Sequence, residues 1–268
     1  SGKSATDLRR HAGARILVLE DNEINRDVAS ELLFGNGLVV DTAENGRIAV
    51  DKMSGASQRY DLILMDVLIP VMDGLKVTQT IRQLPNGHSI PIIAMTANAF
   101  EEDHLACIAA GMDAYLSKPF TREQLSRMLA TWLPGRHAAA HEPAAAPLPA
   151  GDAPINPAAL DAIRRIPGPN GPALVERVIR SFLAETPPRL AELGRSLREA
   201  DAESLRRTAH YLKSSTAHVG AEVLAAQLKA LEASARTASP DATQRLLATI
   251  EEEWSRVRDA LQDTLEGD

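Results

Sequence analysis

DLILMDVLIPVMDG, residues 61–74, is the stretch around which the first half of the chain is organised. Leu62 to Met65 form an unbroken apolar run, which is long enough for a strand buried on both faces and too short for a helix. The run ends in Asp66, and open α/β folds bind their ligands at the carboxyl ends of parallel strands. A lone Asp at such a place often does no more than turn the chain, so the surrounding sequence has to decide its role.

Apolar runs and helical periodicities alternate through the first 134 residues. The runs predict five strands, at residues 15–20, 39–43, 61–66, 91–96 and 113–117. Apolar residues at helical spacing predict five helices. The first carries Ile24, Val28 and Leu32, the second spans residues 45–53, and the third carries Val77, Ile81 and Leu84. The fourth carries Leu105, Ile108 and Met112, and the fifth carries Leu125, Met128, Leu129 and Trp132. This alternation predicts a doubly wound α/β domain, with a parallel sheet covered on both faces.

Polar side chains stand at the carboxyl ends of four predicted strands: Glu20, Asp21, Asp66, Thr96 and Lys118. A parallel sheet gathers these ends along one edge. Three carboxylates repel one another there unless a hard divalent cation lies between them, and Mg²⁺ prefers oxygen ligands. With the cation bound, Asp66 stays ionised and can attack a phosphoryl group, while Lys118 and Thr96 offer donors to phosphoryl oxygens.

This set of residues resembles the receiver domain of two-component response regulators over residues 14–134. The resemblance rests on an acidic pair, a strand-three Asp followed by P-x-M-D-G, a strand-four Thr and a Lys-Pro, in that order. It implies a flavodoxin-like sheet of order 2-1-3-4-5, with Asp66 as the phospho-acceptor. It further implies that Mg²⁺ is bound by Glu20, Asp21, Asp66 and the carbonyl of Leu68. Thr96 and Lys118 are implied to contact the phosphoryl group.

The receiver resemblance also implies an aromatic switch residue at Tyr115 and a cis peptide bond between Lys118 and Pro119. Ile69 replaces the Met of many members, one apolar side chain for another. Two rival folds lack their motifs. A dinucleotide-binding fold requires G-x-G-x-x-G after the first strand, where the chain reads Glu-Asp-Asn. A haloacid-dehalogenase-type phosphatase requires a second Asp two residues after the nucleophile, and that position is Leu68.

The totals indicate a soluble, two-domain chain that is not basic. It has 268 residues, a net charge of −7 and 44% hydrophobic residues. Neither half is basic, which argues against a phosphate-backbone binder. The single Cys107 excludes an intramolecular disulfide and suits a reducing compartment. There is no signal peptide and no apolar run near the ~18 residues of a membrane span. Because the chain begins SGKS without Met, we expect a piece of a longer protein.

Residues 135–154 differ in composition from the segments on either side. Pro and Ala recur without a periodic apolar face, so we expect a mobile, somewhat extended tether between two domains. His137 and His141 have the i, i+4 spacing of metal ligands. Nearby prolines and the lack of a third ligand favour solvated linker residues instead.

The remaining residues read as helix throughout, which predicts an all-α, up-down bundle. Pro187 and Pro188 are expected to end one helix and open the next. Asp201 is expected to cap a long helix that Gly220 terminates. A last helix is expected to start at Pro240.

The helix from Ser204 to Gly220 carries the most informative residue of this segment. Its apolar stripe consists of Leu205, Ala209, Leu212, Thr216 and Val219. At 100° per residue, His210 points about 140° away from the centre of that stripe, towards solvent. Its neighbours on this face are basic or small: Arg206, Arg207, Lys213, Ser214 and Ala217. Cations favour a phosphorylated imidazole, but this geometry alone does not separate a phosphoryl carrier from an idle surface histidine.

The segment AHYLKSSTAHVGA, residues 209–221, resembles the signature of histidine-containing phosphotransfer (Hpt) domains, and the resemblance covers about residues 155–265. It implies that His210 is an exposed phosphoryl carrier, and Lys213 matches the signature as well. A helical bundle offering one reactive histidine fits the all-helical prediction for this segment.

Two positions depart from the Hpt signature, and one further residue is a hypothesis. Ser214 replaces the usual Gly four residues after the histidine, so the approach to His210 is expected to be tighter and transfer slower. His218 stands where Asn is common, and we interpret it as a surface residue. Glu232, on the next helix, is a candidate to hydrogen-bond the ring nitrogen that is not phosphorylated.

Together the two domains resemble the C-terminal part of a hybrid sensor histidine kinase. They imply a relay in which a kinase histidine outside the chain phosphorylates Asp66, His210 takes the phosphoryl group, and a separate response regulator receives it. The implied partners are the kinase core and this regulator, without nucleic acid or direct membrane contact. We expect a cytoplasmic location for this chain, and this expectation is compatible with a full-length protein that is anchored in the inner membrane. Nothing resembles an ATP-binding kinase core, so the chain should not phosphorylate itself from ATP.

Two alternatives stand beside the relay. In the first, the chain is an interaction module, in which the phosphorylation-dependent surface of the receiver regulates a partner and transfer to His210 is secondary. In the second, the first domain is a structural pseudo-receiver, which the complete set of polar residues argues against.

Overall fold

The computed structural model describes residues 11–55, 59–69, 72–96, 101–133, 153–166, 171–235 and 239–267. The chain divides into two compact units, Ser1–Ala146 and Pro147–Asp268. Most of the predicted tether, with His137 and His141, lies outside the described residues. The two units are therefore described one at a time.

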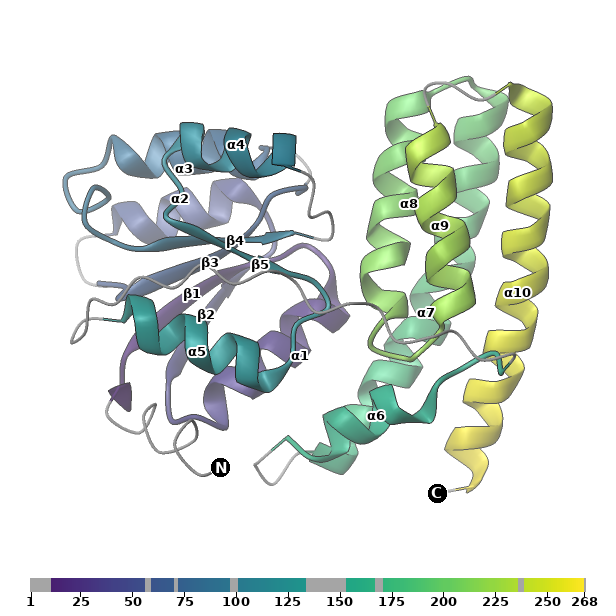
Figure 1. Cartoon of the computed structure of the whole chain (residues 1–268), viewed down its shortest axis with the longest axis horizontal. Helices are drawn as coiled ribbons and strands as arrows, with labels where there is room; N and C mark the ends of the chain where they lie inside the picture. The colour runs from purple at the N-terminus through teal and green to yellow at the C-terminus, as the bar shows by residue number, and fades with distance from the viewer. Residues whose placement is uncertain are drawn as a thin grey trace. The chain divides into compact units, whose positions relative to one another are not determined.

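The first unit is a parallel sheet between two layers of helices (Figure 1). Its strands are β1 (Arg15–Leu19), β2 (Val39–Ala43), β3 (Leu62–Asp66), β4 (Ile92–Thr96) and β5 (Ala114–Ser117). Its helices are α1 (Glu23–Phe34), α2 (Gly46–Ser54), α3 (Gly74–Arg82), α4 (Glu101–Ala110) and α5 (Arg122–Trp132). The strand order is β2-β1-β3-β4-β5, with every neighbouring pair parallel. The predicted doubly wound fold of order 2-1-3-4-5 is confirmed.

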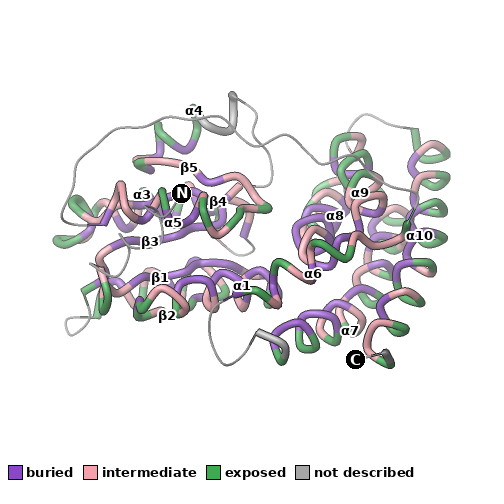
Figure 2. The backbone as a smooth tube through the Cα atoms, turned by 60° about the horizontal axis from the view of Figure 1, so that its bottom comes forward, coloured by how far each residue is buried: buried purple, intermediate pink, exposed green. Residues whose placement is uncertain are grey.

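The apolar runs of β1 and β3 form the centre of this unit. All five residues of β3 are buried, and so are Ile16 to Leu19 in β1 (Figure 2). Helices α2, α3 and α4 cover one face of the sheet, and α1 and α5 cover the other (Figure 1). Because both faces are covered, the central strands lack the apolar–polar alternation of a half-exposed sheet.

Helix α4 departs from its predicted apolar stripe. Leu105 and Ile108 are 63% and 46% exposed, whereas Cys107 and Ala110 are buried. Met112 is buried as well, but it lies beyond the end of the helix. The helix therefore packs through its small residues, which leaves two large apolar side chains on its outer surface.

The strand register brings the predicted site residues to one edge of the sheet. Asp66 pairs with Met95 across β3 and β4, and Thr96 pairs with Ser117 across β4 and β5. The backbone of the MDG motif turns back onto this edge and passes close to the end of β3. A Cβ at Gly74 would lie only 2.5 Å from the carbonyl oxygen of Asp66. Only glycine permits such an approach of two backbone segments.

The second unit is all-helical, as predicted (Figure 1). Its helices are α6 (Pro157–Arg164), α7 (Gly171–Arg198), α8 (Ala202–Thr216), α9 (Glu222–Ser234) and α10 (Pro240–Gly267). Apolar stripes of the four longer helices meet inside the bundle, where the rings of Phe182 and Trp254 pack edge to face with centroids 5.6 Å apart. Asp201 caps α8 by accepting a hydrogen bond from the N–H of Ser204, as expected.

The prediction that Pro187 and Pro188 separate two helices is wrong. Helix α7 runs without interruption from Gly171 to Arg198, with both prolines inside it. Each proline lacks a backbone donor and costs the helix about 3 kcal/mol. Buried apolar side chains on both sides of the prolines, such as Phe182 and Leu193, outweigh this cost.

The turn between α8 and α9 holds the start of α6. The N–H of Asn156 donates to the carbonyl of Gly220 at 2.8 Å, and the Asn156 amide donates to Glu222 at 2.8 Å. Gly220 has a φ of +74°, and a Cβ there would lie 2.3 Å from the carbonyl oxygen of Asn156. The glycine is required both for the left-handed backbone and for this close approach.

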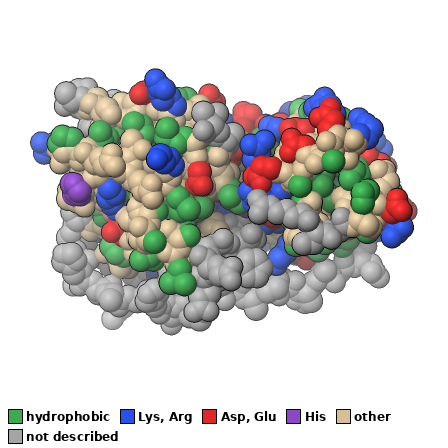
Figure 3. Space-filling view, turned by 90° about the horizontal axis from the view of Figure 1, so that it is seen from above, with side chains coloured by type: hydrophobic (Ala, Val, Ile, Leu, Met, Phe, Trp, Pro, Cys, Tyr) green, Lys and Arg blue, Asp and Glu red, His purple; other side chains and the backbone are tan. Residues whose placement is uncertain are grey.

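Charged residues of both signs cover the visible face of the helical unit in Figure 3. This distribution agrees with a chain whose two halves are both slightly acidic. Among the described residues, no helix combines the length and the apolar character that crossing a membrane requires.

Candidate functional site

Three carboxylates meet at the carboxyl edge of the sheet in the first unit. Glu20 and Asp21 follow β1, and Asp66 ends β3, so that one oxygen from each lies within 4.8 Å of the others. Glu20 and Asp66 are 1% and 3% exposed, respectively. A hard divalent cation takes oxygen ligands of this kind, so the donor set fits Mg²⁺.

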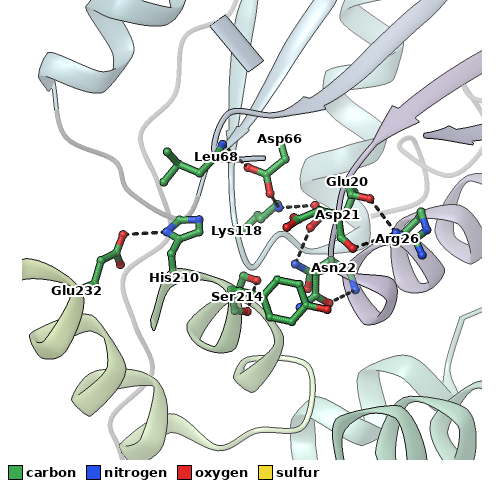
Figure 4. A network of polar contacts seen from close by, with 12 residues as sticks. Glu20, Asp21, Asn22, Arg26, Asp66, Leu68, Lys118, His210, Ser214 and Glu232 are labelled. Carbon is green, nitrogen blue, oxygen red and sulfur yellow. Dashed lines mark hydrogen bonds and ion pairs between the residues drawn. The ribbon is translucent and has the colours of Figure 1, made fainter. Parts of the chain in front are cut away.

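Lys118 lies between two of these carboxylates (Figure 4). Its ammonium contacts Oε2 of Glu20 and lies 2.7 Å from Oδ2 of Asp66. Burial by itself lowers the pKa of Lys118, but the charges and hydrogen bonds of Asp66 and Glu20 outweigh burial and raise it. The side chain therefore remains a cation, placed against the carboxylate that is predicted to accept the phosphoryl group.

The ionised form of Glu20 is destabilised by its surroundings in the cluster. The pKa of Glu20 is raised to about 8, because burial and the neighbouring charge of Asp66 together outweigh the opposing effects of Lys118 and Asn25. A bound cation stabilises the ionised form of a carboxylate, and this effect is strong where burial has raised the pKa of that carboxylate. The electrostatics of the cluster thus agree with its donor chemistry.

The other predicted receiver residues lie around this cluster. The N–H of Leu68 donates to Oδ1 of Asp66 at 3.0 Å, and its role as a carbonyl ligand stays a prediction. Thr96 ends β4, and its carbonyl accepts a hydrogen bond of 2.7 Å from the N–H of Lys118. Tyr115 is half-buried on β5. The expected cis bond between Lys118 and Pro119 is confirmed.

Sequence reasoning missed two residues of the β1–α1 connection. The amide of Asn25 donates to Oε1 of Glu20 at 3.0 Å. The guanidinium of Arg26 donates to the carbonyls of Glu20 and Asp21, at 2.9 and 3.2 Å (Figure 4). Their position on the first turn of the helix that follows the acidic pair was the available signal.

His210 in the second unit is held by one carboxylate from the next helix. Its Nδ1 lies 2.8 Å from Oε1 of Glu232 (Figure 4). The other oxygen of Glu232 accepts a hydrogen bond of 2.5 Å from Lys213. Burial acts to raise the pKa of Glu232, but the hydrogen bonds and charges of His210 and Lys213 outweigh it and lower the pKa to about 2. The hypothesis of a bond between Glu232 and the ring is confirmed.

The tautomer of His210 follows from this contact. An ionised carboxylate only accepts hydrogen bonds, so Nδ1 carries the proton that faces Glu232. In the neutral ring the lone pair is then on Nε2.

The prediction that the outer side of the His210 ring is exposed stays a prediction, whereas its contact with the neighbouring helix is defined. The helical-wheel reasoning considered only the apolar stripe of α8, whereas α8 packs against both α7 and α9. One side of the ring faces α9, because Glu232 binds both His210 and Lys213 there.

The flank of His210 that faces α7 is polar and ordered. The hydroxyl of Tyr211 donates to Glu185 at 2.7 Å, and the guanidinium of Arg189 lies 4.3 Å from the centre of the tyrosine ring. The hydroxyl of Ser214 is turned back onto its own helix, where it donates to the carbonyl of Tyr211 at 2.8 Å. His218 has intermediate exposure, and its interpretation as a surface residue stays a prediction.

Comparison with known proteins agrees with both sites. Residues 16–130 match the family model of the response regulator receiver domain, and residues 177–260 match that of the Hpt domain. The two-component response regulator ORR41 of Oryza sativa subsp. japonica is 46% identical over 118 residues, which cover 43% of this chain and 91% of that protein. The chain therefore belongs to the response regulator receiver family through its first unit, and it carries an Hpt domain in its second.

Longer relatives and solved structures match part of the chain. Histidine kinase 5 of Arabidopsis thaliana is 35% identical over 157 residues, which cover 49% of this chain and only 17% of that kinase. The receiver domain of the sensor histidine kinase PA1611 from Pseudomonas aeruginosa PAO1, crystallised with a coordinated magnesium ion, is 45% identical. The match covers 45% of this chain and 98% of the PA1611 receiver domain, with a TM-score of 0.43. A receiver domain followed by an Hpt domain makes this chain a component of two-component phosphorelay signalling.

Proposed function

We propose that the chain relays a phosphoryl group from a kinase histidine to Asp66, then to His210, and then to a separate response regulator. The observation that carries the proposal is the contact between His210 Nδ1 and Glu232, which leaves Nε2 for nucleophilic chemistry. An isolated receiver needs no such histidine, and an Nε2 lone pair is what attack on an acyl phosphate requires.

In the first step, an oxygen of Asp66 attacks the phosphorus of a phosphohistidine on the kinase. The P–N bond breaks, a P–O bond forms, and the electron pair leaves with the donor imidazole. Lys118 neutralises charge that develops on the phosphoryl oxygens, and Thr96 is assigned the same task as a hydroxyl donor. Glu20, Asp21, Asp66 and the carbonyl of Leu68 would hold Mg²⁺, which supplies further charge neutralisation when bound.

In the second step, Nε2 of His210 attacks the acyl phosphate on Asp66. A P–N bond forms, and the electron pair of the broken P–O bond returns to the carboxylate. The Nδ1 proton stays against Glu232, which stabilises the positive charge that the ring gains. Lys213, on the same carboxylate, lies one helical turn from His210 and is assigned to the phosphoryl oxygens.

Labelled acetyl phosphate with Mg²⁺ tests the relay in the full chain. We expect label on His210 that is acid-labile and base-stable, and we expect the Asp66→Ala variant to lose it. The His210→Ala variant should retain only the base-labile acyl phosphate on Asp66. Label on His210 in the Asp66→Ala variant would contradict the order of the relay.

The interaction module remains the second candidate, because Leu105 and Ile108 leave an apolar surface on α4. Exposed apolar side chains of this kind are common at protein–protein contacts. If the label stays wholly on Asp66 while phosphorylation changes the affinity for a partner, this second reading replaces the relay.

A further inference from the structure

The carboxylate of Glu20 uses its two oxygens for different purposes. Oε1 accepts a hydrogen bond from the Asn25 amide at 3.0 Å, whereas Oε2 contacts the ammonium of Lys118. The same ammonium lies 2.7 Å from Oδ2 of Asp66. Oε2 of Glu20 therefore lies on the side of the phospho-acceptor, and Oε1 is occupied on the side of α1.

Asn25 is a fixed donor rather than an adaptable one. It is 4% exposed and lies on the first turn of α1, where its own N–H donates to the side chain of Asn22 at 3.1 Å. This capping bond fixes the backbone from which the amide projects. The amide consequently acts on Glu20 from a constant position.

The backbone of the acidic pair is fixed by the residue that follows. Arg26 donates from one guanidinium nitrogen to the carbonyls of both Glu20 and Asp21, at 2.9 and 3.2 Å (Figure 4). A glutamate has one more rotatable bond than an aspartate, so a fixed backbone alone does not orient its carboxylate. The side chain of Glu20 needs the second contact that Asn25 supplies.

We propose that Asn25 is a positioning residue of the metal site, which holds the carboxylate of Glu20 so that Oε2 faces Asp66 and a divalent cation. Arg26 supports the same geometry through the backbone. This inference rests on the proposed function, because it assigns Asn25 to the Mg²⁺ site of the receiver. Hydrogen-bond partners of a ligating carboxylate orient it towards the metal, and their loss weakens metal binding.

Titration of the full chain with Mg²⁺ by isothermal calorimetry tests this proposal. Loss of an orienting partner costs about 10- to 100-fold in metal affinity, so we expect Asn25→Ala to bind Mg²⁺ at least tenfold more weakly than the wild type. Asn25→Leu, of similar size to asparagine, should lose as much while keeping the packing. Asn36→Ala is the matched control, because the side-chain amide of this asparagine donates to the carbonyl of Leu32 near the far end of α1.

A double-mutant cycle separates positioning from general damage. In a Glu20→Gln background the carboxylate is already absent, so adding Asn25→Ala should weaken Mg²⁺ binding by less than twofold. If the wild type binds Mg²⁺ and both Asn25 variants bind it equally well, the proposal is wrong and the metal site stands. A full further loss in the Glu20→Gln background would also overturn it. A wild type that binds no Mg²⁺ overturns the proposed metal site together with this inference.

Discussion

Replacing Glu232 by glutamine is the perturbation whose size the structure defines best. Glu232 lies between His210 Nδ1 and Lys213 Nζ, at 2.8 and 2.5 Å, with a side chain that is only 7% exposed. These two partners lower its pKa from 4.5 to about 2 despite its burial. Glutamine keeps the shape of the side chain and removes the charge, so the Glu232→Gln variant isolates the electrostatic contribution.

The direction of the pH dependence follows from the lowered pKa. A carboxylate with a pKa near 2 in the folded state and 4.5 in the unfolded state stabilises the fold above pH 4.5, and this stabilisation is lost as the pH falls towards 2. The shift corresponds to about 3 kcal/mol in the free energy of unfolding at pH 7, and to about 1 kcal/mol at pH 3. The variant should lack this pH-dependent part.

Urea unfolding monitored by tryptophan fluorescence measures the effect in the intact chain. The chain has two tryptophans, and a Trp132→Phe background leaves Trp254 of the helical unit as the only reporter. In this background, we expect the loss of unfolding free energy caused by Glu232→Gln to be about 2 kcal/mol larger at pH 7 than at pH 3. A loss that stays constant between these pH values would refute the assigned ionisation of Glu232.

Three further predictions concern the stability of the two units. Arg82→Ala should destabilise the first unit by about 2–4 kcal/mol in urea unfolding, because its guanidinium donates to three backbone carbonyls and to the carboxylate of Asp113; an unchanged midpoint would contradict this. Gly220→Ala should destabilise the helical unit by about 1–3 kcal/mol, since its φ is +74° and its Cβ would meet the carbonyl of Asn156; wild-type stability would contradict the close approach. Mg²⁺ at 100 times its dissociation constant should stabilise the first unit by about 2.7 kcal/mol, with reversal by EDTA and no such gain in Asp66→Ala; equal stabilisation of that variant would place the ion elsewhere.

The receiver fold and its acidic edge were predictable because each depends on short-range pattern. Buried parallel strands read as continuous apolar runs, and their ends share one edge of the sheet. The positions of Glu20, Asp21 and Asp66 therefore followed once the strands were assigned. The orienting role of Asn25 did not follow, because it depends on how the first turn of α1 is directed towards the strand end.

The errors in the helical predictions have a common origin in tertiary packing. Pro187 and Pro188 break helices by local propensity, but α7 is held by its neighbours on both sides of them. Leu105 and Ile108 lie on the apolar stripe that predicts α4, whereas the helix packs through its smaller residues.

The order in which the phosphoryl group visits Asp66 and His210 tests the central claim most directly. After the full chain is mixed with labelled phosphodonor and Mg²⁺, rapid quenching at successive times separates base-labile label on Asp66 from base-stable label on His210. The relay predicts that label on Asp66 rises first and then declines as label on His210 accumulates. Label that appears on His210 without this delay, and at the same rate in the Asp66→Ala variant, would contradict it.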